Sequence, residues 1–372
     1  MQSANEPRRG RSLPFGQRGA LALVGGAIVI IGLVAAIVGR SVWAGTTASP
    51  TPTGSQPAST TLTATTATAT PVSSPAPSIS ATGLVPTAAP TAVPTATSTA
   101  PLPPLPSLLA AIGDSYSQAY SVSPSYLRDH IGFSWVIGSA HNDGVLSMYE
   151  RFKAIGGSPL VVDAATSGKA MEDAPRQANL VVAAAKKLKA GQTAYVTFEL
   201  GTNDLCADPN PKTDPASFGR DLATAIATLR AGLPAGSRIL MLSVPDFPHL
   251  HDITQANPAA RANLALLANS NRCPPYLGDN GLFSMAQAND YLGRYNAALE
   301  GVCQDIAATD SPSGRLYCTY NATLLAETDF LIADLSTVDY FHPSLSGQAR
   351  MAADAWAADV WSGVPIPKGA AQ

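Results

Sequence analysis

The stretch Leu108-Leu-Ala-Ala-Ile112, followed directly by Gly113-Asp-Ser-Tyr-Ser117, decides the fold of this 372-residue chain. A short, continuous apolar run that ends in glycine and polar residues is typical of a strand buried on both faces. Three similar runs follow at 160–163, 195–200 and 238–243, and a fifth strand is expected either near 315–320 or near 330–333.

Longer stretches with helical patterns separate these strands, at 172–190, 215–231, 285–307 and 344–361. Alternation of strands and helices predicts an α/β fold, with a parallel sheet covered by helices on both faces. Ligands of such sheets bind beyond the carboxyl ends of the strands. The polar motifs that follow the strands therefore lie where chemistry is expected.

Two of these motifs contain the parts of a serine nucleophile system, which needs a base and a group that orients the base. Ser115 would lie on the turn from the first strand into a helix, with its N–H close to the helix N-terminus. In Asp339-Tyr-Phe-His-Pro343, an acid and a histidine are three residues apart. Asp339 can then hold Nδ1 of His342, and Nε2 can accept the proton of Ser115.

Two further motifs offer donors for the oxyanion that forms when a carbonyl is attacked. Gly168 closes Asp163-Ala-Ala-Thr-Ser-Gly168 and lacks a Cβ, so its N–H can approach a reacting centre. Asn203, in Gly201-Thr-Asn-Asp204, carries a side-chain amide. Each motif alone also has a plain structural interpretation, as a helix cap or a turn.

Together and in this order, the four motifs resemble those of the GDSL/SGNH hydrolase superfamily. The longer strings from Gly201 to Cys206, Ser243 to Asp246 and Asp339 to Ser344 resemble its secreted, disulfide-bonded branch of phospholipase B-like lipases and esterases. The similarity runs from about residue 111 to 356. The resemblance implies a flavodoxin-like three-layer α/β/α sandwich with a central parallel sheet, and no cofactor.

The resemblance also implies a role for each site residue. Ser115 is then the nucleophile, His342 the general base and Asp339 the group that orients it. The backbone N–H groups of Ser115 and Gly168 and the amide of Asn203 form the oxyanion hole. One departure stands out, because Asp163 occupies a position at which the family usually has asparagine. This departure bears on the placement of the Gly168 loop.

The four cysteines are Cys206, Cys273, Cys303 and Cys318. An even number is typical of disulfides outside the cytoplasm, and four cysteines allow three pairings. We favour the sequential arrangement, Cys206 with Cys273 and Cys303 with Cys318. No two cysteines have the spacing of a zinc knuckle, so the sequence predicts no metal site. We expect the remaining histidines to be structural or exposed: His130, His141, His249 and His251.

The N-terminal part of the chain indicates the compartment. Residues 1–19 are basic and predicted to be cytoplasmic, and residues 20–39 are uncharged and apolar. Twenty helical residues span about 30 Å, the thickness of a bilayer core. This segment is either a transmembrane signal anchor or a signal peptide cleaved after Val42-Trp43-Ala44. Residues 40–106, rich in Thr, Ser, Pro and Ala, are expected to form a disordered stalk, and 107–372 the hydrolase domain.

The net charge of the chain after residue 106 limits which partners it can bind. After residue 106 the chain holds 18 basic and 25 acidic residues, a net charge of −7, which argues against binding to nucleic acid. We expect a monomeric catalytic domain that takes a small-molecule or lipid ester, at the cell membrane or secreted. A carbohydrate O-deacetylase, an acyltransferase and a surface-displayed binding module on the same fold stay open. The substrate-binding loops are expected at 121–142, 207–216 and 247–276.

Overall fold

The computed structural model describes residues 101–122, 127–206, 213–269, 273, 285–325, 330–367 and 369. The predicted basic segment, membrane helix and nearly all of the predicted stalk lie outside these residues. Within the described ranges, no helix has the length and apolar character needed to cross a membrane.

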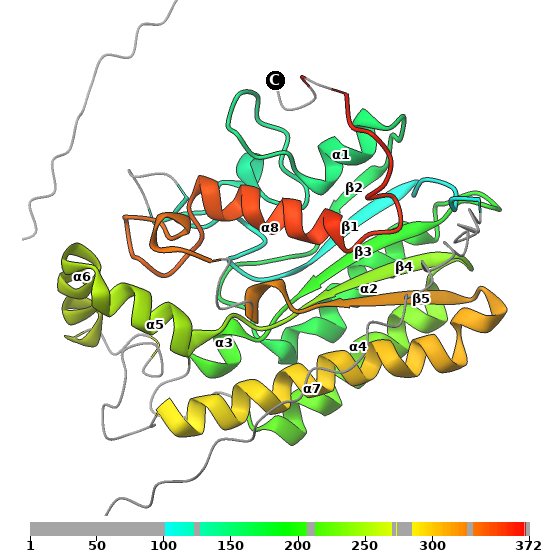
Figure 1. Cartoon of the computed structure of the whole chain (residues 1–372). Helices are drawn as coiled ribbons and strands as arrows, with labels where there is room; N and C mark the ends of the chain where they lie inside the picture. Colours follow the sequence, from blue (N-terminus) through cyan, green and yellow to red (C-terminus); the bar gives the residue numbers. More distant parts are fainter. Residues whose placement is uncertain are drawn as a thin grey trace, which may run out of the picture. The chain divides into compact units, whose positions relative to one another are not determined.

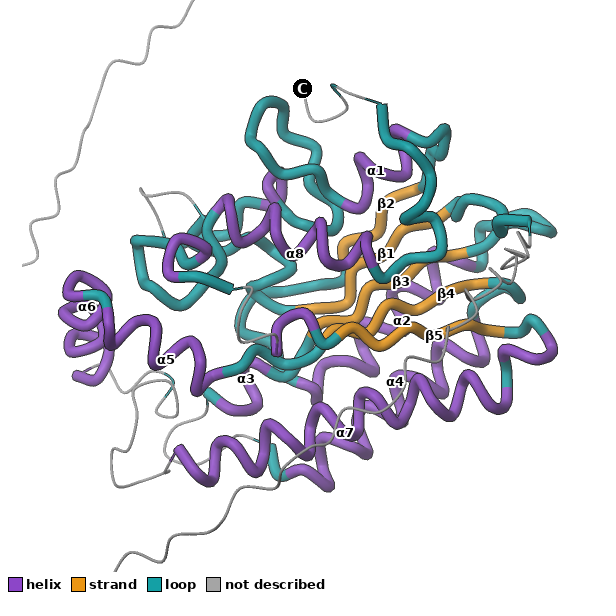
Figure 2. Tube along the Cα trace, viewed as in Figure 1, coloured by secondary structure: helices purple, strands orange, loops and turns teal. Residues whose placement is uncertain are grey.

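A five-stranded parallel sheet forms the centre of the described part (Figure 2). The strand order is β2-β1-β3-β4-β5, and every neighbouring pair is parallel. The strands are β1 (Leu108–Gly113), β2 (Leu160–Asp163), β3 (Ala194–Glu199), β4 (Ser237–Leu242) and β5 (Leu316–Asn321). The fifth strand thus corresponds to the alternative near residues 315–320. The other alternative, a strand at 330–333, is wrong. A short 3-10 helix, Ile332–Asp334, falls there instead.

Helices cover both faces of the sheet, with α1 and α8 on one side and α2, α4 and α7 on the other (Figure 1). The fold is therefore the predicted three-layer α/β/α sandwich. The α-helices are α1 (Met148–Ala154), α2 (Ala174–Ala185), α3 (Thr202–Leu205), α4 (Pro215–Gly232), α5 (Phe247–Ala256), α6 (Pro258–Asn269), α7 (Met285–Thr309) and α8 (Leu345–Ala357).

The core has two layers, one on each face of the sheet. Every residue of β1 and β3 is buried, because helices lie against both faces of these central strands. On one face, Phe218 of α4 stacks on Tyr295 of α7 with ring centroids 4.1 Å apart. On the other, Phe152 of α1 meets Trp356 of α8 at 5.5 Å. Each such large side chain contributes about 1.5–3 kcal/mol by leaving water.

Two sequence expectations are wrong in this region. Residues 114–121 form successive turns, and no helix follows β1 directly. Within the range expected to be a binding loop, 247–276, the structure has helices α5 and α6. Asp246 caps α5 by accepting the N–H of His249, and the proline at the helix start needs no N–H donor there.

Both disulfides have the sequential pairing that the sequence favoured. Cys206, directly after α3, bonds to Cys273. Cys303 of α7 bonds to Cys318 of β5, with Cα atoms 4.9 Å apart. The second bridge ties a helix of one outer layer to the edge strand, which has fewer neighbours than the central strands.

Candidate active site

Ser115 lies in the turn that follows β1, at the carboxyl edge of the sheet. Only 5% of its surface is exposed. The turn holds itself together through the N–H of Gln118 on Asp114 O, at 3.2 Å, and the N–H of Tyr120 on Ser115 O, at 3.0 Å. Because no helix begins here, the helix dipole that the sequence suggested for Ser115 does not act, and other groups must organise the turn.

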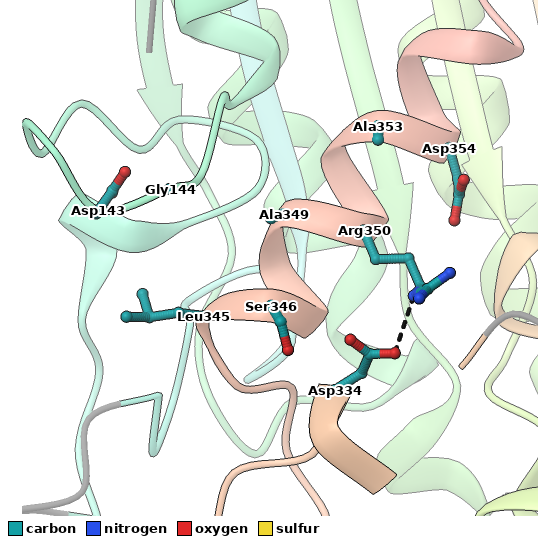
Figure 3. Close-up of a pocket in the computed structure, with 9 residues that line it drawn as sticks. All are labelled: Asp143, Gly144, Asp334, Leu345, Ser346, Ala349, Arg350, Ala353 and Asp354. Carbon is teal, nitrogen blue, oxygen red and sulfur yellow. Dashed lines mark hydrogen bonds and ion pairs between the residues drawn. The ribbon is translucent and has the colours of Figure 1, made fainter. Parts of the chain in front are cut away.

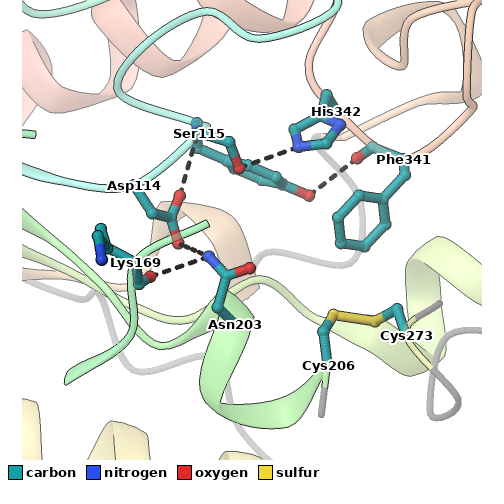
Figure 4. Close-up of a disulfide and its surroundings, with 9 residues drawn as sticks. Asp114, Ser115, Lys169, Asn203, Cys206, Cys273, Phe341 and His342 are labelled. Carbon is teal, nitrogen blue, oxygen red and sulfur yellow. Dashed lines mark hydrogen bonds between the residues drawn. A yellow bond between two sulfur atoms is a disulfide. The ribbon is translucent and has the colours of Figure 1, made fainter. Parts of the chain in front are cut away.

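His342 lies between Ser115 and Asp339 (Figure 4 shows the first pair). Its Nε2 is 2.9 Å from Ser115 Oγ, and its Nδ1 is 2.8 Å from Asp339 Oδ2. The loop that carries both residues is closed by an antiparallel bridge between Leu335 and Pro343. The geometry allows Ser115 to pass its proton to Nε2 while the carboxylate holds Nδ1–H.

Asp339 is fixed and ionised by its contacts. Its Oδ1 accepts the backbone N–H groups of Phe341 and His342, each at 3.0 Å. Burial raises the pKa of Asp339, but the bond from the His342 ring, the charge of His342 and the two backbone N–H groups together outweigh it, so the pKa lies below its usual range. A carboxylate that stays charged can stabilise the imidazolium formed when His342 takes a proton.

Aromatic rings surround the imidazole of His342. The ring centroids of Tyr120, Phe341 and Tyr116 lie 4.8, 5.0 and 5.8 Å from that of His342. The hydroxyl of Tyr116 also donates to the carbonyl of Phe341 at 2.9 Å. These rings restrict how the imidazole can turn and join the β1 turn to the histidine loop.

The three predicted oxyanion donors come from separate elements at the same edge of the sheet. Gly168 has a φ of +78°, which favours glycine, and no atom of the described residues lies within 4 Å of where a Cβ would stand. In the part of the chain that the structure describes, the N–H groups of Ser115 and Gly168 have no hydrogen-bond partner. Nδ2 of Asn203 donates to Asp114 Oδ2 at 3.0 Å and to Lys169 O at 2.9 Å (Figure 4). Both hydrogens of this amide are therefore engaged.

A model of the GDSL-like lipase/acylhydrolase family matches residues 111–350. The chain belongs to this family. The match runs from within β1 to within α8 and includes all four motifs. The GDSL-like protein is therefore an ester hydrolase. The comparison with curated protein sequences found no match.

Three solved structures illustrate what the chain is similar to. TesA is 18% identical, with a TM-score of 0.39, over 67% of this chain and 96% of its own. The psychrotrophic esterase EstA from Pseudoalteromonas sp. is 14% identical, with a TM-score of 0.39, over 68% and 96%. AlinE4, an SGNH-hydrolase family esterase, is 16% identical, with a TM-score of 0.31, over 56% and 82%.

Asp163, at the position where the family usually has asparagine, contacts the serine turn. Its Oδ1 accepts from Nε2 of Gln118 at 2.7 Å, and burial raises its pKa. Two backbone bonds continue this connection, from the N–H of Ala164 to Ala111 O at 2.9 Å and from the N–H of Thr166 to Gly113 O at 3.1 Å. The loop that carries Gly168 is thus attached to β1 and its turn.

Two buried acids beside the serine turn of this GDSL-like site were missed by sequence reasoning. Asp114 is fully buried, and burial raises its pKa to about 7. Glu199, the last residue of β3, is 1% exposed, and burial together with the charge of Asp114 raises its pKa well above the usual range. The available signal was a glutamate at the end of an otherwise uncharged strand, directly before Leu200-Gly-Thr-Asn203.

Two of the remaining histidines have partners other than Ser115, His342 and Asp339. Nε2 of His249 is 2.8 Å from Phe330 O, and His251 lies beside Asp252. The described residues contain no group of three or more side chains that could hold a metal ion. A groove along α8 is lined in part by Asp334 and Arg350, which form an ion pair at 2.9 Å (Figure 3). No triad residue lines that groove.

Proposed function

We propose that the chain is an extracytoplasmic serine ester hydrolase that works through an acyl-enzyme. Ser115 Oγ attacks the ester carbonyl while its proton passes to His342 Nε2. The N–H groups of Ser115 and Gly168 stabilise the oxyanion, and the amide of Asn203 joins them when it turns one hydrogen from Asp114 or Lys169 O to the substrate. His342 then protonates the leaving alcohol, and an acyl group remains on Ser115. Water, activated by the same imidazole held by Asp339, releases the acid.

The observation that carries this proposal is the continuous chain from Asp339 through His342 to Ser115, at 2.8 and 2.9 Å. The test is a series of p-nitrophenyl esters of increasing acyl length, assayed beside a phospholipid and an acetylated glycan. We expect release of p-nitrophenol, with the acyl length that gives the highest kcat/KM defining the substrate class. Transfer of the acyl group to an added alcohol in preference to water would favour an acyltransferase. Absence of turnover on every ester would exclude the hydrolase.

The proposed location rests on the N-terminal sequence and the cysteines. Four arginines precede the apolar segment 20–39, and only Arg40 follows it before a region free of charge up to Asp114. This asymmetry favours export of the domain, and two disulfides fit an oxidising compartment. Protease added to intact cells is expected to cut within residues 45–106 and release an active fragment. A fragment that stays protected until lysis would contradict this location.

Asn203→Ala is expected to lower kcat by about 10²–10³-fold with little change in KM. The substitution removes an amide near the oxyanion, and it also releases the carbonyl of Lys169 and the carboxylate of Asp114. The measurement is steady-state kinetics on a p-nitrophenyl ester. Asn179→Ala is the matched control, since this exposed amide caps a carbonyl within α2. A variant that only raises KM would make Asn203 a substrate-binding residue.

A further inference from the structure

The carboxylate of Glu199 is directed entirely at the turn that carries Ser115. Glu199 ends β3 and pairs in register with Gly113, the last residue of β1. Its Oε2 accepts from the hydroxyl of Ser117 at 2.9 Å. Interactions with the backbone of Asp114 and Ser117 also lower the pKa of this carboxyl group. These residues lie on both sides of Ser115, so one buried group acts on the residue before the serine and on a residue after it.

Asp114 completes this arrangement. Its Oδ1 accepts the N–H of Tyr116 at 3.0 Å, and its Oδ2 accepts from the amide of Asn203 at 3.0 Å. Asp114 thus holds the N–H of Tyr116, while Glu199 interacts with the backbone of Asp114 and Ser117. Within the described residues, no hydrogen bond engages the N–H of Ser115. This N–H is the one that the proposed mechanism directs at the oxyanion.

A buried carboxyl group at this position has an unfavourable effect on the free energy of folding. Burying a carboxyl group costs free energy even when a raised pKa favours its neutral form, and β3 is otherwise filled with neutral, mostly apolar side chains. A second buried carboxyl adds to the cost, because the charge of Asp114 raises the pKa of Glu199. An apolar side chain would fill this place in the core without a desolvation cost, but it would offer no hydrogen-bond acceptor to the turn. Backbone carbonyls of the turn accept the N–H groups of Gln118 and Tyr120, whereas the N–H of Tyr116 has a side-chain acceptor.

We propose that Glu199 is a positioning residue for catalysis. It holds the turn that carries Ser115 so that, among the N–H groups of this turn, the one of Ser115 faces the oxyanion. This inference rests on the proposed function, since it assigns Glu199 a part in the same acyl transfer. Glu199 does not touch the substrate in this mechanism. It acts through Asp114 and Ser117, and the effect of its loss should therefore fall on the chemical step.

The experiment compares Glu199→Ala, Glu199→Gln and the wild-type protein by steady-state kinetics and by the rate at which a p-nitrophenyl phosphonate labels Ser115. Rates are taken per folded molecule, well below each variant's Tm. We expect Glu199→Ala to lower kcat at least 100-fold with KM within about threefold, and to slow labelling by the same factor. Glu199→Gln keeps one acceptor oxygen and the shape of the side chain, so we expect a loss of only about tenfold.

The matched control is Asp359→Asn. Asp359 is also a buried carboxyl, and burial raises its pKa, but the interaction that opposes this rise is with Tyr195, near the opposite end of β3. We expect a lower Tm and an unchanged kcat. The inference is wrong if Glu199→Ala keeps kcat within threefold, or if Asp359→Asn loses as much kcat. If Glu199→Ala does not fold, the kcat of Glu199→Gln tests the inference. An unchanged kcat in Glu199→Gln would then overturn it. A wild-type protein that hydrolyses no ester and is not labelled at Ser115 overturns the proposed function itself.

Discussion

Ser115→Ala is expected to lower kcat by about 10⁶-fold, the effect of losing the nucleophile in a serine hydrolase. The substitution removes the atom that would form the acyl bond, and nothing nearby replaces it. Among the described residues, the side chain of Ser115 makes one hydrogen bond, to Nε2 of His342, so its loss should change the free energy of unfolding by only about 1 kcal/mol. The measurements are hydrolysis of a p-nitrophenyl ester and thermal unfolding of the same preparation.

A serine-directed phosphonate provides an independent check, because it should label Ser115 in the wild-type protein and nothing in the variant. Ser243→Ala is a matched control. Ser243 follows β4 at the same edge of the sheet, is 1% exposed, and has a buried hydroxyl without a partner within the described part of the chain. We expect this control to keep its activity and its labelling. Full activity in Ser115→Ala, or labelling of a different residue, would remove Ser115 as the nucleophile.

The sequence predicted the central strands better than the edge of the sheet, for a physical reason. β1 and β3 are buried on both faces, so they form continuous apolar runs that stand out from the surrounding residues. β5 lies at the edge, and all but its first residue are partly exposed, which left two positions for the fifth strand. Helix α5 was missed because its start contains proline and two histidines, which resemble a loop in the sequence.

The functional motifs could be read as sequence strings, but the contacts between them could not. Ser115 and His342 are 227 residues apart, and only the fold sets the distance between them. The contacts of Glu199 depend on its register with Gly113, since a shift by one residue would turn its side chain to the other face of the sheet. The two hydrogen bonds of Asn203 likewise depend on where the fold places Asp114 and Lys169.

Asp339→Asn is expected to lower kcat by about 10⁴-fold, because the amide would hold His342 in the wrong tautomer. Oδ1 of Asp339 accepts two backbone N–H groups at 3.0 Å, and an amide can satisfy these donors only with its oxygen. Its NH₂ group then faces Nδ1 of His342, which must accept instead of donate. The ring proton moves to Nε2, and this nitrogen can no longer take the proton of Ser115.

The measurement is kcat at pH 7–8, together with thermal unfolding as a function of pH. Contacts with His342 and the backbone hold the pKa of Asp339 in the folded protein below its usual range. In the unfolded chain the pKa of this carboxyl is about 3.9, so its charge stabilises the folded protein at pH values above about 3.9. The Tm difference between wild type and variant should therefore be full at pH 7 and shrink as the pH falls below about 4.

Asp334→Asn separates loss of stability from loss of the tautomer. Asp334 is 4% exposed, belongs to the same segment of the chain and pairs with Arg350 at 2.9 Å, but it does not contact the imidazole. We expect this control to lower the Tm and leave kcat within about threefold. If Asp339→Asn kept kcat within tenfold of the wild type, the carboxylate would not set the tautomer of His342. The bond at 2.8 Å between Asp339 and His342 would then only hold the loop in place.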